Sequence, residues 1–438
     1  MSSAAAAKPA TSAAAPASAA APAASASAKP AASAAAGSAA AKPAANGGVI
    51  KIGILDDVTG QAAVEGAEMR INADVVIEQI NNTGGINGKQ VQAVYYDPKT
   101  QPDQAIQFAT QAAQQDNVDL IAGAILSSEC LGVQQLAPKL GLVYSPLNAC
   151  ATEDFAAKSC NKFSFRSVPA GRQLTDPSID FLTKQYGKKW GIIYPDYAFG
   201  TSQVQAYEAS LAKVGGQLTV KIPVPLGETN VTPYVSKIPT DGSINGLFDS
   251  ENGTDLARVV GVMAQFGIFK KLPVVQGALG RESFQGTYPA ALDGGILTAT
   301  HTSTPLPNNQ FDADYFKAFG EMAKKDSQVA SALGGPDKAT PGTTLGYTAY
   351  TAMETLKLGM RNSGFTGRAD TDKLISALEQ INVTQPSTEY PAGGMIMNKQ
   401  DHQGRMPLYV MKINGQKEDV IQQIPADQLP QFNTCTAA

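Results

Sequence analysis

The pattern that most constrains this fold is a strand, loop, helix, turn and second strand within residues 51–97. An apolar run at 51–55 predicts a buried strand, which leads into a polar loop at 56–60. Residues 67–80 carry apolar side chains at helical spacing, and a Gly- and Asn-rich turn separates them from a second strand at 91–96. In open α/β sheets ligands bind at the carboxyl ends of parallel strands, so this polar loop is a candidate ligand site.

Strand and helix signals alternate in the same way along much of the chain. Residues 120–125 and 142–145 predict further strands of this first series, and residues 163–168 predict a strand that leaves it. A second series follows, in which helical stretches separate strands at 190–194, 217–224, 246–248 and 273–276. Two comparable series predict an α/β fold of two lobes with mostly parallel sheets and a cleft between them.

The pattern of the remaining residues predicts that the chain returns to the first lobe and then crosses again to the second. Three helical stretches follow residue 297, and residues 394–420 are typical of hairpin strands. We therefore expect five segments: a tether at 1–48, the first part of lobe 1 at 49–168, the first part of lobe 2 at 169–297, a crossover with the second part of lobe 1 at 298–390, and a lobe 2 hairpin with the C-terminal tail at 391–438.

The first 48 residues are nearly all Ala, Ser, Pro, Lys, Gly and Thr. Such a segment cannot bury enough apolar area to offset the entropy lost on ordering, so we expect a disordered tether. It lacks the apolar core of a signal peptide. Two interpretations stay open: an artificial start of a mature chain, or the tether of a surface lipoprotein in which Met1 replaces the lipidated Cys. No run of 18 or more apolar residues follows that could span a membrane.

Charge and histidine content exclude several functions. The tether holds three lysines and no acid, which leaves 31 basic and 38 acidic side chains, a net charge of −7, in the rest of the chain. This balance argues against nucleic-acid binding. With only His301 and His402, and no zinc-like cysteine spacing, we expect no metal and no cofactor. The two histidines are poorly placed for a Ser/His/Asp triad and no Gly-x-Ser-x-Gly motif occurs, so we expect no enzyme.

Four cysteines are present, Cys130, Cys150, Cys160 and Cys435. Cys150 and Cys160 enclose a short polar loop, which favours a disulfide between them, and a Cys130–Cys435 bond follows only by elimination. Four cysteines allow three pairings, and four reduced, buried thiols are a further alternative.

Several short motifs together resemble the type I periplasmic solute-binding proteins of ABC transporters, and within them the leucine/isoleucine/valine-binding branch. The resemblance covers the chain from about residue 49 to its end. It implies two Rossmann-like lobes that are joined by three crossovers and close on a ligand by hinge motion. The motifs are Lys51–Leu55, Asn82–Lys89, Tyr96–Pro98, Ser127–Ser128, Tyr144–Pro146, Phe165–Ser167 and Tyr194–Gly200.

By this resemblance, ligand contacts come from loops at the ends of strands. Ser127 and Ser128 begin a helix, which suits a ligand carboxylate, although a serine there can equally cap the helix. The other candidates also have alternatives to ligand binding. Aromatic side chains can pack between helices and strands, and acidic side chains can face solvent or accept hydrogen bonds from backbone amides. The candidates are Asp57, Glu65, Ser127, Ser128, Asn148 and Ala149 in lobe 1, and Tyr197, Phe199, Glu251, Gln276 and Leu279 in lobe 2.

One departure from the family pattern bears on the ligand. Amino-acid-binding members usually carry an acid in the loop at 276–280, where it pairs with the ligand ammonium, and here Leu279 takes its place. Either Glu65 or Glu251 supplies the charge, or the ligand has no α-ammonium, as in an amide, an aromatic acid or another small carboxylate.

The resemblance implies a monomeric periplasmic or cell-surface protein that captures a small amino acid, amide or carboxylate-bearing solute. Such a protein delivers its ligand to the membrane permease of an ABC transporter. The alternative is a ligand-sensing receptor or regulator with the same two lobes.

Overall fold

The computed structural model describes residues 48–148, 150, 152–277, 280–432 and 435. The expectations for the tether at 1–48, apart from Gly48, and for Ala149 and Leu279 lie outside the described residues.

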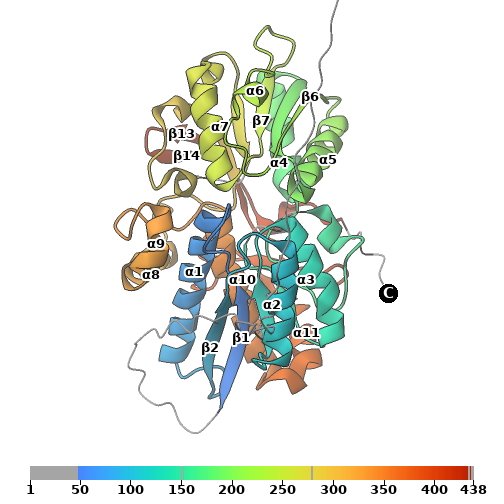
Figure 1. The fold of residues 1–438 in the computed structure, drawn as a ribbon, viewed down its shortest axis with the longest axis vertical. Coiled ribbons are helices and arrows are strands. Elements are labelled where there is room, and N and C mark those ends of the chain that lie inside the picture. Colours follow the sequence, from blue (N-terminus) through green and yellow to red (C-terminus); the bar gives the residue numbers. More distant parts are fainter. Residues whose placement is uncertain (1–47, 149, 151, 278–279, 433–434, 436–438) are drawn as a thin grey trace, which may run out of the picture. The chain divides into compact units, whose positions relative to one another are not determined.

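The first lobe is built on a four-stranded parallel sheet in the order β2-β1-β3-β4. Ile50, Ile52 and Ile54 of β1 are fully buried on one face of the sheet, and Leu55 is buried in a separate cluster on the other, because helices cover both faces of a parallel sheet. Figure 1 shows these helices in blue and teal around the strands. The elements are β1 (Val49–Leu55), α1 (Ala63–Asn82), β2 (Gln90–Tyr96), α2 (Pro102–Gln114), β3 (Leu120–Gly123), α3 (Ser127–Leu140) and β4 (Tyr144–Ser145).

The second lobe is built on a seven-stranded sheet in the order β14-β13-β9-β8-β7-β5-β6. Neighbouring strands from β5 to β9 are parallel, whereas β13 pairs antiparallel with β9 and with β14. The hairpin turn between β13 and β14 lies at Gly415 and Gln416, one residue beyond the predicted turn at Asn414 and Gly415. The strands are β5 (Lys189–Pro195), β6 (Gln217–Val224), β7 (Gly246–Asp249), β8 (Val274–Gly277), β9 (Ile296–Ala299), β13 (Leu408–Asn414) and β14 (Lys417–Ile424).

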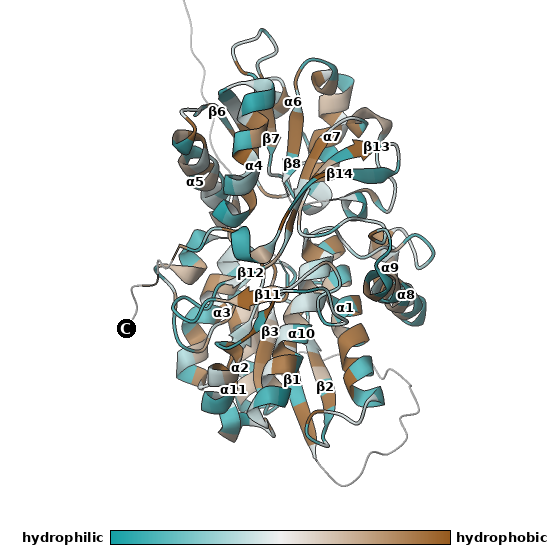
Figure 2. Ribbon diagram, turned by 180° about the vertical axis from the view of Figure 1, so that it is seen from behind, coloured by the Kyte–Doolittle hydropathy of each residue, from teal (hydrophilic) through white to brown (hydrophobic). Residues whose placement is uncertain are grey.

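The first helix of the second lobe precedes β5, the other three connect successive strands from β5 to β8, and together they lie on both faces of the sheet (Figure 2). Trp190 of β5 stacks on Phe248 of β7 with ring centroids 4.5 Å apart, within the core under these helices. The helices are α4 (Gly171–Tyr186), α5 (Ala198–Lys213), α6 (Thr232–Val235) and α7 (Gly253–Gln265).

The segment between β9 and β13 returns to the first lobe. Helix α10 packs against α1, and both belong to the hydrophobic core that contains β1. A small antiparallel sheet, β10-β11-β12, places Met395 and Met397 in that same core, so within 394–420 only β13 and β14 join the second lobe. The elements are α8 (Gln310–Lys325), α9 (Ser327–Ala330), α10 (Leu345–Ser363), α11 (Thr371–Leu378), β10 (Asn382–Val383), β11 (Met395–Met397) and β12 (Gly404–Arg405).

The chain therefore passes between the lobes three times, after β4, after β9 and after β12. Arg166, in the first passage, is fully buried and joins it to the residue just before β12, because its Nε donates to Oε1 of Gln403 at 2.6 Å. Its Nη1 donates to the carbonyl oxygens of Cys150 and Thr152, at 2.6 Å each. One guanidinium thus ties together three segments at the junction of the lobes.

The disulfide joins Cys160 to Cys435, whereas Cys130 and Cys150 are buried and free. The predicted Cys150–Cys160 and Cys130–Cys435 pairings are therefore wrong. The loop between Cys150 and Cys160 folds into a short 3-10 turn at Glu153–Ala156, and Cys150 packs into the core beside Cys130. Cys160 instead meets a residue 275 positions away, a contact that local spacing cannot reveal.

Across the part of the chain that the structure describes, no helix combines the length and apolar character needed to cross a membrane.

Candidate functional site

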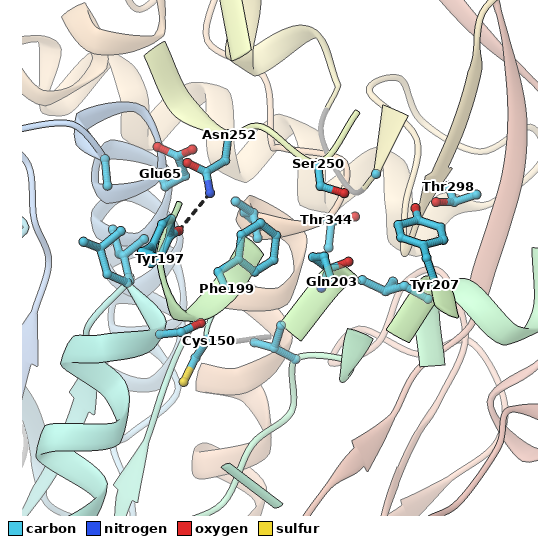
Figure 3. Close-up of a pocket in the computed structure, with 18 residues that line it drawn as sticks. Glu65, Cys150, Tyr197, Phe199, Gln203, Tyr207, Ser250, Asn252, Thr298 and Thr344 are labelled. Carbon is cyan, nitrogen blue, oxygen red and sulfur yellow. Dashed lines mark hydrogen bonds between the residues drawn. The ribbon is translucent and has the colours of Figure 1, made fainter. Parts of the chain in front are cut away.

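A pocket lies where the carboxyl ends of the strands of both lobes meet, with about 720 Å³ of empty space, part of it open to solvent. First-lobe residues that line it follow β1, β3 and β4, and second-lobe residues follow β5 and β7. Thr298 of β9 and Thr344, just before α10, line it from the segments that lead between the lobes. Figure 3 shows these side chains converging from several elements.

The start of α3 supplies a hydroxyl to the first-lobe wall. Glu129 accepts the backbone N–H of Leu126 at 2.9 Å, so this glutamate caps the helix. Ser127 is the first residue of α3 rather than its cap, and its Oγ is buried without a partner among the described residues. The capping interpretation of Ser127 is therefore wrong, and its hydroxyl is available to a ligand.

Glu65, in the first turn of α1, is the carboxyl group of the pocket lining, and it is only 2% exposed. Its pKa is raised from 4.5 to about 7, chiefly by burial and to a smaller extent by the nearby Glu282, against the lowering effect of the N–H groups of its own backbone and of Gly253. Its Oε2 has no partner among the described residues. Near neutral pH this carboxyl can therefore hold or release a proton, and a ligand cation beside it would favour ionisation.

Aromatic and amide side chains form much of the second-lobe wall. Tyr197 precedes α5, and its hydroxyl accepts Nδ2 of Asn252 at 3.0 Å, the bond drawn in Figure 3. Phe199 lies beside Tyr197 with ring centroids 6.0 Å apart. Burial raises the pKa of Tyr197 and of Tyr207, so both phenols keep their protons and can donate hydrogen bonds.

The charge of the lining limits what can bind. Among the described lining residues none is Lys, Arg or His, and Glu65 is the only Asp or Glu. His301 is instead buried against Asp312 at 2.7 Å, and His402 lies 3.3 Å from Glu379. The pocket thus offers apolar and aromatic surface, hydroxyl and amide groups, and one titratable acid, which suits a small amphipathic molecule.

Four predicted ligand residues line the pocket: Glu65, Ser127, Tyr197 and Phe199. Five others do not, namely Asp57, Ser128, Asn148, Glu251 and Gln276.

Three of these five residues are buried and form hydrogen bonds within the protein. Asp57 accepts the N–H of Thr100 at 2.7 Å, and Asn148 donates to the backbone oxygen of Glu65 at 3.0 Å, which helps to position that residue. Gln276 donates to Oδ2 of Asp249 at 3.1 Å.

The sequence reasoning missed several lining residues that periodicity could have found. Gln203 and Tyr207 follow Phe199 at intervals of four on α5, so they share its helical face. Ser250 and Asn252 line the pocket, whereas the predicted Glu251 between them is buried away from it, and burial raises its pKa to about 9. No local sequence pattern marks Thr298 and Thr344 as pocket residues, because they reach the pocket only through the passages of the chain between the lobes.

Two α/β lobes, joined by three chain passages and lining one pocket at their strand ends, define a bilobal solute-binding protein. The chain belongs to the family described as periplasmic binding protein, whose model matches residues 49–418, and it is a type I member of that class. It is 23% identical over 339 residues to a leucine-, isoleucine-, valine-, threonine- and alanine-binding protein of Pseudomonas aeruginosa, covering 77% of this chain and 84% of that protein.

Solved structures of similar fold include one in complex with an aromatic acid and one named for an amino acid. A solute-binding protein of an ABC transporter from R. palustris, in complex with benzoate, superposes with a TM-score of 0.73 at 16% identity, covering 89% of this chain and 100% of that one. A leucine-binding protein from Thermotoga maritima gives a TM-score of 0.70 at 16% identity, covering 87% and 100%. At these identities the likeness establishes the fold and leaves the ligand open.

Proposed function

We propose that this protein is the extracytoplasmic solute-binding component of an ABC transporter and that it captures an amino acid with an apolar side chain. It binds without turnover and hands its ligand to the membrane permease. The observation that carries this proposal is a pocket lined by both lobes, in which a buried serine hydroxyl and a buried carboxyl oxygen find no hydrogen-bond partner among the residues that the structure describes.

The two unpartnered groups match the two ends of an amino acid. The Ser127 hydroxyl lies in the first turn of α3, a 14-residue helix whose N-terminal dipole favours a ligand carboxylate. Glu65 lies in the first turn of α1, on the same lobe, and offers its free Oε2 to an ammonium group. The absence of cationic residues among the described lining disfavours ligands with two negative charges.

Aromatic side chains suit the apolar part of such a ligand. Tyr197, Phe199 and Tyr207 line the pocket from the second lobe, and Figure 3 shows Glu65 near Tyr197. Aromatic acids would fit the same walls but would leave Glu65 unpaired. The relatives that bind branched-chain amino acids support the first class of ligand, and the benzoate complex supports the second.

Hinge closure is the mechanism that this arrangement favours. Oγ1 of Thr254 on α7 donates to Oε1 of Gln61 at 3.1 Å, and the N–H of Gly253 donates to Glu65. The facing edges of the two lobes, which we call the lips, are therefore in contact beside the pocket. A ligand that contacts both lobes stabilises this closed arrangement over an open one and shifts the population towards it.

A thermal-shift screen tests the proposal. We expect leucine, isoleucine, valine or phenylalanine to raise the melting temperature of the full chain, and leucinamide, benzoate and 4-hydroxybenzoate serve as probes that lack one of the two charges. Mass spectrometry of small molecules released from denatured protein would identify a ligand retained from the cell. If none of these solutes stabilises the protein and none is released, the proposal fails.

A further inference from the structure

Two cysteines outside the Cys160–Cys435 disulfide lie side by side behind the first-lobe wall of the pocket. Cys130 is the fourth residue of α3, and Cys150 lies in the passage that follows β4. Both are buried, at 0% and 1% exposure, and both belong to the hydrophobic cluster that α2 and α3 form against the sheet of the first lobe. The same carbonyl oxygen, that of Ile125, contacts the thiol of Cys130 at 4.0 Å and the N–H of Cys150 at 3.4 Å.

The backbone on both sides of this pair is fixed. The carbonyl oxygen of Cys150 accepts Nη1 of Arg166 at 2.6 Å, and the N–H of Cys130 donates to the oxygen of Leu126 at 3.0 Å within α3. A metal site would need further ligands, and the described residues contain no group of three or more His, Cys, Asp or Glu arranged to hold an ion. The surroundings therefore suit a covalent bond between the two sulfur atoms better than a metal.

The position of the pair connects it to the ligand site. Cys150 lines the pocket itself, and Figure 3 shows it at the edge of the cavity, below Tyr197 and Phe199. Ser127 lines the pocket from the same helix that carries Cys130, one turn earlier. A bond between the two sulfur atoms would tie the loop at Cys150 to the start of α3.

We propose that Cys130 and Cys150 form a second disulfide in the mature protein and that this bond fixes the first-lobe wall of the pocket. The proposal rests on the extracytoplasmic location given above, because disulfides form and persist in oxidising compartments. The Cys160–Cys435 bond fits the same setting. Once that bond is formed, Cys130–Cys150 is the one pairing left among the four cysteines.

The chemistry is thiol–disulfide exchange with an oxidase that carries a reactive disulfide. One cysteine, as thiolate, attacks a sulfur of that disulfide and forms a mixed disulfide, which releases one thiolate of the oxidase. The second cysteine then attacks the mixed disulfide and displaces the oxidase as a dithiol. Two thiols lose two protons and two electrons, and the oxidase disulfide takes up both electrons. Burial raises the pKa of Cys130, so the exchange is fastest before α3 is packed.

The test is a thiol map of the full chain exported to a bacterial periplasm. The protein is quenched in acid, alkylated with N-ethylmaleimide in denaturant without reductant, and digested for mass spectrometry. We expect no alkylated cysteine and a cross-linked peptide pair that contains Cys130 and Cys150. Alkylation of both of these residues, while Cys160 and Cys435 stay linked, would overturn the proposal, as would a bond from Cys150 to Cys160.

Variants test the consequence for the pocket wall. A Cys160→Ser/Cys435→Ser double variant is the matched control, and it should keep the Cys130–Cys150 cross-link. In a Cys130→Ser/Cys150→Ser double variant, we expect the amide hydrogens of Leu147, Asn148 and Thr152 to exchange about tenfold faster than in the wild type. Unchanged exchange would refute the fixing of the wall. Neither measurement needs a ligand, so these outcomes stay distinct from failure of the proposed function.

Discussion

Replacing Glu65 by glutamine gives the sharpest test of the electrostatics of the pocket. The carboxyl is buried, one of its oxygens has no partner among the described residues, and its pKa is raised from 4.5 to about 7. The folded protein therefore binds this proton more tightly than the unfolded chain does. Above pH 4.5 the folded state increasingly bears the penalty of a buried carboxylate, and the penalty is complete above pH 7.

The size of the effect follows from the pKa shift. A difference of about 2.5 pKa units corresponds to roughly 3 kcal/mol at pH 8, and to less than about 1 kcal/mol at pH 5. Glutamine is neutral at both values and removes this penalty. Its NH2 group brings a pH-independent cost of about 1 to 3 kcal/mol if it finds no acceptor in the ligand-free pocket. The informative quantity is thus the change in ΔΔG between the two pH values, which we expect to be about 2 kcal/mol in favour of the variant at pH 8.

Urea denaturation of ligand-free wild type and Glu65→Gln at pH 5 and pH 8 measures this quantity. Glu321→Gln, which changes an exposed acid on α8, is the control and should show no such pH dependence. Buried acids that do not interact with Glu65 titrate equally in both proteins and cancel in the comparison. Glu68 does not cancel, because the Glu65 carboxylate raises its pKa, and loss of that charge also favours the variant at pH 8. An equal ΔΔG at both pH values would refute the reasoning that Glu65 ionises at a cost in the folded state.

Three further substitutions give separate outcomes. Ser127→Ala should weaken the binding of a carboxylate ligand by about fivefold to thirtyfold in calorimetry. The protein should lose no stability, because the Ser127 hydroxyl has no protein partner among the described residues. As a control, Ser128→Ala should change the affinity by less than about twofold. Tyr197→Phe removes the acceptor of Asn252 and should lower ligand affinity by roughly fivefold. Arg166→Met leaves several buried acceptors unpaired, so it should lower the free energy of unfolding, measured by urea denaturation, by about 3 kcal/mol or more. A decrease below about 1 kcal/mol would contradict the inference that Arg166 holds these segments together.

The fold was predictable where local patterns carry the information. The isoleucines of β1 and the turn predicted at Asn414 and Gly415 mark a strand and a hairpin that the structure contains. The residues at 394–405 were harder, because short strands such as β11 have the same pattern in either lobe. Burial of Met395 and Met397 against the first-lobe core decides their place, and that is a tertiary contact.

The site was predictable only in part, for a related reason. Glu65, Ser127, Tyr197 and Phe199 lie in loops or first helical turns after strands, where the βα pattern places candidates. Within such loops, the direction of each side chain depends on local backbone geometry. Glu251 shows this, since the residues on either side of it line the pocket while it does not. The disulfide depended on a contact across 275 residues, which no local pattern encodes.

The buried guanidinium of Arg166 also bears on how the lobes can move. It holds Gln403, just before β12 and the third passage, and the backbone at Cys150 and Thr152 with short bonds around one planar group. Segments bonded in this way can bend together but resist twisting or sliding past each other. The opening of the lobes should then have essentially one degree of freedom. A single pair of fluorophores on the two lips, near Gln61 and Thr254, would follow that coordinate and turn the protein into an optical sensor for its ligand.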